Sequence, residues 1–254
     1  MSVRSHLDAT ASADWSDFVD ELDRWGKAGH VATLWWRDDD AVAMTPALAR
    51  LLSVAGPAPL ALAVIPAAAE ASLAAALRGR RQVAILQHGW SHANHGTDKK
   101  SEFPPERSAA EVEGDLIAGG ERLTRLFGET VPVLAPPWNR LAPEFEALLP
   151  RAGIAALSAM ASRRGGGPER IDVHVDLVAW KAGRGFIGEE AALGGIVGEL
   201  RQRRLGLSPV GRATGILTHH LIMDDATEAF AAALGEAIAG HRAARWSDIR
   251  EALP

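Results

Sequence analysis

Short apolar runs alternate with amphipathic stretches along the chain. The apolar runs predict strands at residues 31–36, 59–65, 82–86, 131–135, 154–157, 171–178 and 214–218. Apolar positions spaced three or four residues apart predict helices at residues 14–27, 45–54, 67–77, 108–127, 143–149, 189–204 and 227–241. Polar surface segments are expected at residues 99–105 and, as a mobile glycine-rich loop, at residues 162–168.

This alternation of strand and helix favours a parallel α/β architecture, in which each helix covers the sheet between two strands. The pattern runs through about seven strand–helix pairs, and we see neither an internal repeat nor a linker. A chain of 254 residues is a usual length for one α/β barrel. We therefore expect one domain over residues 1–254, with a helix at about residues 13–28 packed outside the barrel.

Composition narrows the classes of function. The net charge of −5 gives no basic field for nucleic acid, and the absence of cysteine excludes thiolate metal sites and cysteine nucleophiles. Residues 1–8 lack the apolar core of an export signal, and no apolar stretch is long enough to span a membrane. We expect a cytoplasmic protein without nucleic-acid or membrane partners; a homo-oligomer stays open.

Polar clusters follow several of the predicted strands. They lie at residues 38–40, 87–95, 137–139 and 219–220, each directly after an apolar run. Barrel enzymes gather their active sites at the carboxyl ends of the strands, where these four clusters would meet. The shared placement is a stronger indication of one site than any cluster alone.

The cluster at residues 87–95 holds three histidines within eight residues. His88 and His92 are four apart, so a helical turn or tight loop would aim both imidazoles the same way. Two histidines and one carboxylate suit a catalytic zinc ion, which keeps an open position for substrate. Gly89 stands where zinc proteases carry their glutamate base, so the base must come from elsewhere. The three adjacent aspartates at residues 38–40 are the natural source of both ligand and base.

These residues resemble the polysaccharide deacetylase superfamily, which implies a distorted (β/α)7-type barrel. The run Trp36-Arg37-Asp38-Asp39-Asp40 is similar to a first motif of the type Thr-Phe-Asp-Asp-Gly. The resemblance implies Asp38 as general base and Asp39 as metal ligand, although Asp40 in place of glycine leaves the pair Asp39 and Asp40 open. The run His88-Gly89-Trp90-Ser91-His92 is similar to a second motif, His-Ser/Thr-x-x-His, and implies His88 and His92 as the other metal ligands.

Three further motifs follow in the order of that superfamily. The segment at residues 135–138 keeps the Pro-aromatic part of the third motif but has Ala135 in place of its arginine, which Arg37 or Arg140 could replace. The resemblance implies that the backbone N–H of Trp138 holds the oxyanion and that His219 is the general acid, with His220 as the alternative. The substrate pocket is expected to include Leu217, Trp180, Asp176, Trp90 and Asn139.

The resulting hypothesis is a metal-dependent hydrolase that removes an acetyl or similar acyl group from an N-acylated sugar or another C–N amide. The cofactor would be a divalent metal, with Zn²⁺ favoured, and the partner a small-molecule or oligosaccharide substrate. One alternative is a non-catalytic metal- or carbohydrate-binding relative with the same fold. The other is an Fe(II) enzyme with two histidines and one carboxylate, which the β/α alternation disfavours because such sites usually lie on antiparallel barrels.

Overall fold

The computed structural model describes residues 12–161 and 169–253. Its strands are β1 (Ala32–Ala41), β2 (Leu60–Val64), β3 (Val83–Gln87), β4 (Val133–Leu134), β5 (Ala156–Leu157), β6 (Glu169–Arg170), β7 (Val175–Asp176), β8 (Thr214–Thr218) and β9 (Ala244–Trp246). They form one sheet in the order β6-β5-β4-β3-β2-β1-β8-β7, with β9 beside β1, and the paired strands run parallel.

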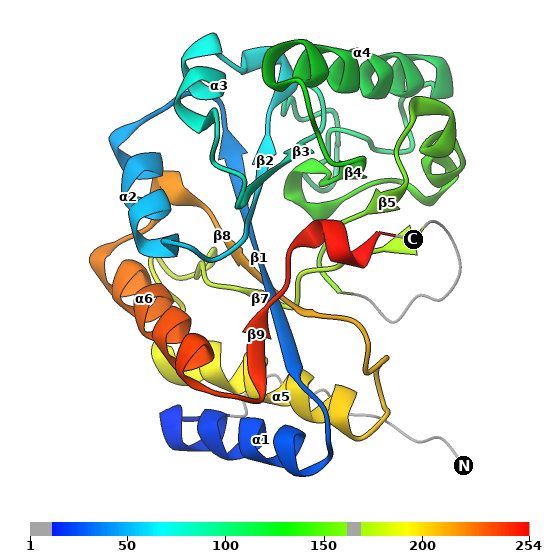
Figure 1. The fold of residues 1–254 in the computed structure, drawn as a ribbon. Coiled ribbons are helices and arrows are strands. Elements are labelled where there is room, and N and C mark those ends of the chain that lie inside the picture. Colours follow the sequence, from blue (N-terminus) through cyan, green and yellow to red (C-terminus); the bar gives the residue numbers. More distant parts are fainter. Residues whose placement is uncertain (1–11, 162–168, 254) are drawn as a thin grey trace, which may run out of the picture.

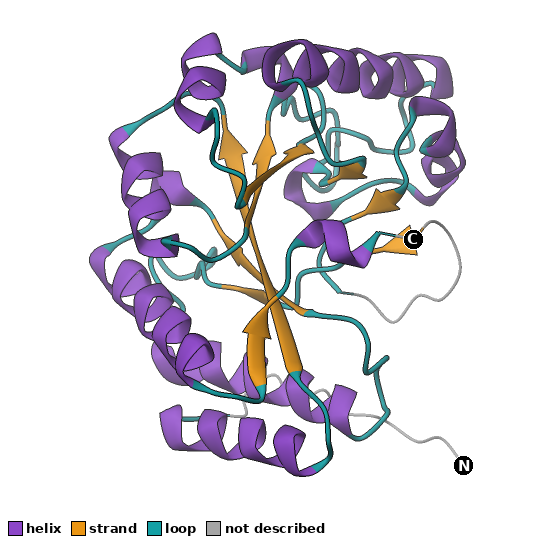
Figure 2. Cartoon of the chain, viewed as in Figure 1, coloured by secondary structure: helices purple, strands orange, loops and turns teal. Residues whose placement is uncertain are grey.

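Helices cover the outside of this sheet (Figures 1 and 2). The α-helices are α1 (Trp15–Lys27), α2 (Pro46–Ala55), α3 (Ala71–Leu77), α4 (Ala109–Phe127), α5 (Glu189–Arg204) and α6 (Asp225–Gly240). Helix α1 packs against α5 at the end of the molecule where β1 begins. The sheet curls without closing, because β6 and β7 are its two ends, and this confirms the expected distorted (β/α) barrel.

Side chains alternate between the helices and the barrel interior, as the two-residue period of a strand requires. On β2, Leu60 and Leu62 pack with the outer helices, whereas Ala61 lies in the inner cluster. On β1, Trp36 lies on the helix side and Trp35 in the interior. Small residues from the neighbouring strands leave room inside the barrel for the large side chains of β1.

Most predicted elements are present, with informative differences. Strand β1 continues through the aspartates to Ala41, although the acidic run was expected after the strand. The predicted helix at residues 143–149 is a 3-10 helix, Pro143–Leu148, and the predicted strand at residues 171–178 keeps only the short β7. The expected surface segment at residues 99–105 is partly wrong, because Ser101, Glu102 and Phe103 are buried. The loop expected at residues 162–168 lies outside the described residues.

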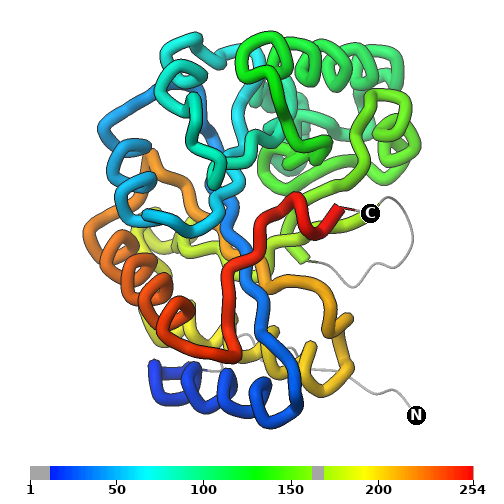
Figure 3. Tube along the Cα trace, in the orientation of Figure 1, coloured from blue at the N-terminus to red at the C-terminus, as the bar shows by residue number. Residues whose placement is uncertain are grey.

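Strand β9 was not predicted. It is three residues long and pairs with the first half of β1, and beyond it the chain turns away from β1 toward the C-terminus (Figure 3). Trp246 of β9 stacks on Trp36 with the ring centroids 5.9 Å apart. Among the described helices, none is long and apolar enough to cross a membrane.

Candidate active site

The three aspartates point in different directions because they belong to a strand. Arg37 and Asp39 share the inner face of β1, and Asp38 lies on the other face with Trp36. Regular alternation would also send Asp40 to that other face. Asp40 instead has a φ of 72°, and the pairing with β2 is irregular between Asp38 and Ala41. This bulge places the Asp40 carboxylate at the carboxyl end of β3.

Asp40 lies beside both histidines of the 87–95 cluster. Its Oδ1 atom is 3.2 Å from Nε2 of His88 and 3.3 Å from Nε2 of His92. One ligand atom from each of the three residues can be chosen so that all lie within 4.8 Å of one another. The structure therefore brings Asp40, and not Asp39, next to the two histidines, which corresponds to the second of the two aspartate pairs that the sequence left open.

The donor set fits a divalent cation. His88 is buried, and its Nδ1 donates to the carbonyl of Ala135 at 2.8 Å, which leaves Nε2 as the ring nitrogen that faces Asp40. Burial alone would raise the pKa of Asp40, but the hydrogen bond and charge of His88 lower it to about 2. Burial lowers the pKa of His88, yet Asp39 and Asp40 more than offset this and raise it. Electron-pair donors held this close favour a positive charge between them.

Asp39 is held by an arginine from its own strand. Arg37 Nε lies 2.9 Å from Asp39 Oδ1, and its Nη2 donates to Asp39 Oδ2 at 2.9 Å. Both side chains are buried. The same guanidinium donates to the Oγ and carbonyl of Ser158 and to Oδ1 of Asn139 at 2.6–2.8 Å. An ion pair with two contacts of this kind fixes the orientation of the carboxylate.

His219 lies between two carboxylates. Its Nε2 is 3.9 Å from Oδ2 of Asp39, and its Nδ1 is 4.0 Å from Oδ1 of Asp176. The Trp180 indole donates to Asp176 Oδ2 at 2.7 Å and lies edge-on to the His219 ring, with centroids 4.8 Å apart. Burial raises the pKa of Asp176, although Trp180 and His219 lower it in part. Asp176 and Trp180, two of the residues expected in the substrate pocket, thus lie beside His219.

Asp38 and His220 form a separate buried pair. His220 Nδ1 lies 2.5 Å from Asp38 Oδ1, and the Thr218 hydroxyl donates to Asp38 Oδ2 at 2.7 Å. Trp36 in turn donates to the Thr218 hydroxyl. Burial is the main cause that raises the pKa of Asp38. The placement differs from the base role expected for Asp38, because its carboxylate is fully buried and committed to the end of β8.

The other expected site residues are distributed around this centre. The Trp138 ring lies 4.3 Å from that of His92, and Trp138 has a φ of 54°. Leu217 is buried in the inner cluster. Asn139 Oδ1 accepts from Arg37, and Asn139 also lines a cavity of about 610 Å³. The backbone of Trp90 donates to Glu102 and accepts from the N–H of Ala67.

Sequence reasoning missed Ser158 and Glu102. Ser158 binds Arg37, and Glu102 binds the histidine loop. Neither residue lies in a motif, and Glu102 falls in a segment whose polarity suggested the surface. The glycine at position 89, where the resembling motif has serine or threonine, is the one signal that something else fills that space.

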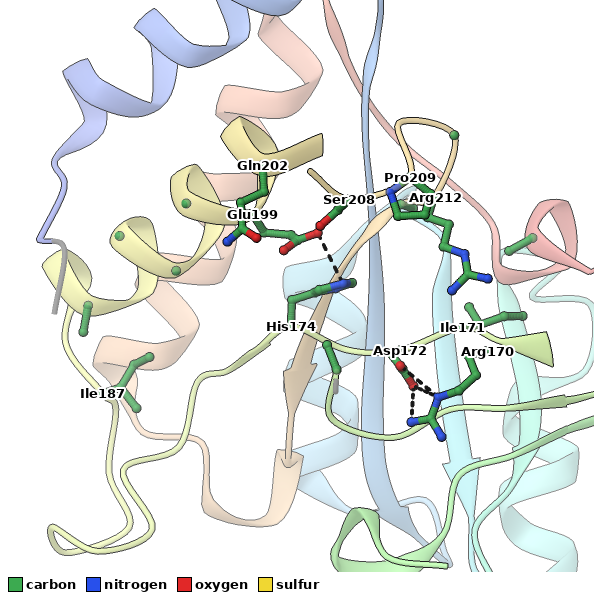
Figure 4. Close-up of a pocket in the computed structure, with 18 of the residues that line it drawn as sticks. Arg170, Ile171, Asp172, His174, Ile187, Glu199, Gln202, Ser208, Pro209 and Arg212 are labelled. Carbon is green, nitrogen blue, oxygen red and sulfur yellow. Dashed lines mark hydrogen bonds and ion pairs between the residues drawn. The ribbon is translucent and has the colours of Figure 1, made fainter. Parts of the chain in front are cut away.

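A cavity of about 1290 Å³ lies apart from these residues, between α5 and the strand edge near β7 (Figure 4). His174 lines it, accepts from the Gly215 N–H with Nδ1 and faces Glu199, with Nε2 3.6 Å from Oε1. Burial, together with the charges of Arg203 and Arg212, lowers the pKa of His174 to about 4.

Because of the lowered pKa of His174, we expect the free energy of unfolding to fall in acid. The unfolded chain takes up the proton near pH 6.5 and the folded chain only near pH 4, so folding weakens as the pH falls between these values. At pH 5 this amounts to roughly 2 kcal/mol. Urea unfolding at pH 7 and pH 5 should show a larger drop for the wild type than for His174→Asn, whose amide oxygen can replace Nδ1. Equal drops would contradict the prediction.

The geometry thus defines a β/α-barrel centre in which a possible cation site, a braced carboxylate and a paired histidine meet at the carboxyl ends of the strands. No protein-family model and no curated protein sequence matches the chain. Solved structures do match it, among them deacetylases and family 4 carbohydrate esterases.

Three of these structures show how similar the matches are in sequence, fold and coverage. The family 4 carbohydrate esterase from Streptomyces lividans, in complex with acetate, has 14% identity and a TM-score of 0.59, and the match covers 86% of this chain and 93% of that one. The family 4 acetyl xylan esterase from Clostridium thermocellum, in complex with a cobalt ion, has 14% identity and a TM-score of 0.54, covering 87% and 89%. A mutant pseudoenzyme of the family with restored activity has 14% identity and a TM-score of 0.56, covering 89% and 69%. The chain has the fold of the polysaccharide deacetylases.

Proposed function

We propose that the chain is a divalent-metal-dependent deacetylase of the polysaccharide deacetylase type. It would remove an acetyl or similar acyl group from an N-acylated sugar or another C–N amide, with the described barrel as the catalytic domain. The observation that carries the proposal is the meeting of Asp40, His88 and His92 beside an arginine-braced Asp39. The fold of carbohydrate esterase family 4 supports it.

Asp40, His88 and His92 would hold the metal. A Zn²⁺ or Co²⁺ ion bound there would make water more acidic and polarise an amide carbonyl. The Nδ1–H of His88, donated to Ala135, fixes the tautomer that ligation requires. His92 and Asp40 are partly exposed, with side-chain exposures of 24% and 27%, so solvent and substrate can reach this side of the cluster.

Asp39 is the proposed general base, and Arg37 its positioning residue. The two contacts from Arg37 fix the orientation of the Asp39 carboxylate on the side of His219, where it would accept a proton from water. The backbone N–H of Trp138 would donate to the oxyanion that forms as the water adds. The structure thus leads us to move the base and ligand roles one position along the chain from the first sequence assignment.

His219 is the proposed general acid for the leaving nitrogen. Asp176 faces its Nδ1, so the imidazole can present a proton from Nε2 on the side of Asp39. His220 is bound to Asp38 and would not serve. Trp180, which is 46% exposed, offers an apolar ring beside His219 on which a sugar could lie, and Leu217 would line the acetyl pocket.

The test is acetate release by the purified protein. Metal-free protein and protein reloaded with Zn²⁺ or Co²⁺ would be given N-acetylated sugars and oligosaccharides, with acetyl esters as a separate panel. We expect release only after metal loading and loss of release with a chelator. Stoichiometric metal binding and sugar binding without any acetate would favour the non-catalytic alternative. Oxygen uptake with Fe²⁺ would favour the oxygenase.

A further inference from the structure

The loop that carries the two histidines has an unusual backbone. After β3 ends at Gln87, residues 88–92 form no regular helix, and both Gly89 and His92 have positive φ values, 60° and 59°. His88 is tied to the sheet through its own N–H, which donates to the carbonyl of Val64. His92 lies at the far end of the loop, so its position depends on what holds the residues between.

A buried carboxylate holds those residues. Glu102 is 0% exposed. Its Oε1 accepts from the N–H of Ser91 at 2.7 Å and from the Ser91 hydroxyl at 3.1 Å, and its Oε2 accepts from the N–H of Trp90 at 3.1 Å. Successive backbone N–H groups around an anion form a concave anion site, and here the protein supplies its own anion.

Gly89 makes room for this carboxylate. A Cβ atom at position 89 would lie 1.9 Å from Glu102 Oε2 and 2.7 Å from Cδ of Pro137. A side chain there would also need a φ of 60°, which residues other than glycine rarely adopt. The Glu102 carboxylate therefore occupies the space that a side chain at position 89 would need, and the loop can close over it only with glycine there.

The charge of Glu102 is not balanced by a nearby cation. Across the described residues, no arginine, lysine or histidine nitrogen lies within 4 Å of its carboxylate oxygens. Arg107 contacts the Glu102 backbone carbonyl, and its ion pair is with Asp115. The groups that satisfy these oxygens come from the loop itself, so the loop geometry depends on the Glu102 side chain.

We propose that Glu102 is a positioning residue for the metal centre: it holds residues 90–91 so that His88 and His92 face Asp40 together. This inference rests on the proposed function. Without Glu102, the two N–H groups lose their acceptor, and the loop would sample conformations in which His92 turns away from Asp40. The free energy of metal binding would then include the cost of ordering the loop.

The experiment compares Glu102→Gln with Glu106→Gln in the full chain. Glutamine keeps the size of Glu102 but loses the charge and one acceptor, and Glu106 is exposed four residues away. Co²⁺ would be titrated into each metal-free protein and followed by calorimetry and by its visible absorption. We expect Glu102→Gln to bind Co²⁺ about 10- to 100-fold more weakly, with a changed spectrum, and Glu106→Gln to match the wild type.

A second measurement does not need metal. Amide hydrogen exchange of the metal-free protein should be faster in residues 88–92 of Glu102→Gln than in the wild type. Glu102→Asp, which keeps the charge on a shorter side chain, should lie between the two and serves if the glutamine variant folds poorly. Affinity and exchange equal to the wild type would overturn the inference. A lower melting temperature with unchanged Co²⁺ affinity and spectrum would show a structural role only, which also overturns it.

The outcomes separate the two proposals. If the wild type binds no Co²⁺, the proposed metal site is wrong, and the exchange measurement still decides whether Glu102 orders the loop. If the wild type binds Co²⁺ and Glu102→Gln binds it equally well, the metal site stands and the role of Glu102 is wrong.

Discussion

Asp40→Ala is expected to lose the divalent metal, whereas Asp38→Asn should keep it. Asp40 is the carboxylate that lies within 3.3 Å of both histidine Nε2 atoms. Removal of a ligand should weaken Co²⁺ binding by more than about 100-fold, because even the outer partners of a ligand are typically worth 10- to 100-fold. Acetate release should fall to background at metal concentrations that saturate the wild type. Calorimetric titration of each metal-free variant measures the effect.

Asp38→Asn is the matched control for the order of the aspartates. Asp38 is paired with His220 and buried, so its loss should lower the free energy of unfolding by about 3 kcal/mol and leave the metal ligands in place. Loss of metal from Asp39→Asn while Asp40→Ala retained it would restore the first sequence assignment, in which Asp39 is the metal ligand and Asp38 the base.

Asp39→Asn is expected to keep the metal and lose turnover. The amide cannot accept a proton from water, and general-base catalysis typically contributes 10²- to 10⁴-fold, so kcat should fall by about that factor. Its oxygen can still accept from Arg37, which keeps the local structure. Steady-state kinetics and Co²⁺ titration on the same preparation separate turnover from binding.

The chain contains a matched control for this variant. Asp172 is likewise held by an arginine two residues earlier, with Arg170 Nη2 2.8 Å from its Oδ1, but this pair lies by the cavity near β7. Asp172→Asn should leave kcat and metal affinity close to the wild type. A comparable loss of kcat in both variants would indicate a general effect of breaking an arginine–aspartate pair, and the role of Asp39 would be wrong.

The sequence could predict the barrel because its apolar periods are strong and local. Strands β2, β3 and β8 are buried throughout and have apolar centres, and the long α4 begins with a capping box at Ser108 and Glu111. Strand β9 escaped prediction because it is three residues long and depends on β1 for its pairing. The length of β1 was missed because its second half is charged, and only the folded partners of those charges show that they can be buried.

The sequence could predict which types of residue meet at the candidate site, but not which aspartate faces the two histidines. The pairing of an aspartate with His88 and His92 follows from spacing and from the barrel rule, but which aspartate faces them depends on the positive φ of Asp40. Asp40 carries no signal for that conformation in the sequence, since one residue of bulge reverses the direction of a side chain. The brace of Asp39 was open between two arginines, and the structure places Arg37 there, with Arg140 bound to the carbonyl of Lys100.

The position of Arg37 has a consequence for how this protein could diversify. Where a residue of a neighbouring loop holds the catalytic base, that loop must keep its conformation, because a change in the loop would also move the base. Here Asp39, the proposed base, and Arg37, which braces it, share one strand, two residues apart, and the loop at residues 135–140 contributes Asn139 as an additional contact. We expect the exposed Arg140 at the end of this loop to tolerate substitutions that change substrate preference with little cost to turnover, whereas the backbone at Ala135, which accepts from His88, and at Trp138, the proposed oxyanion donor, must keep its position.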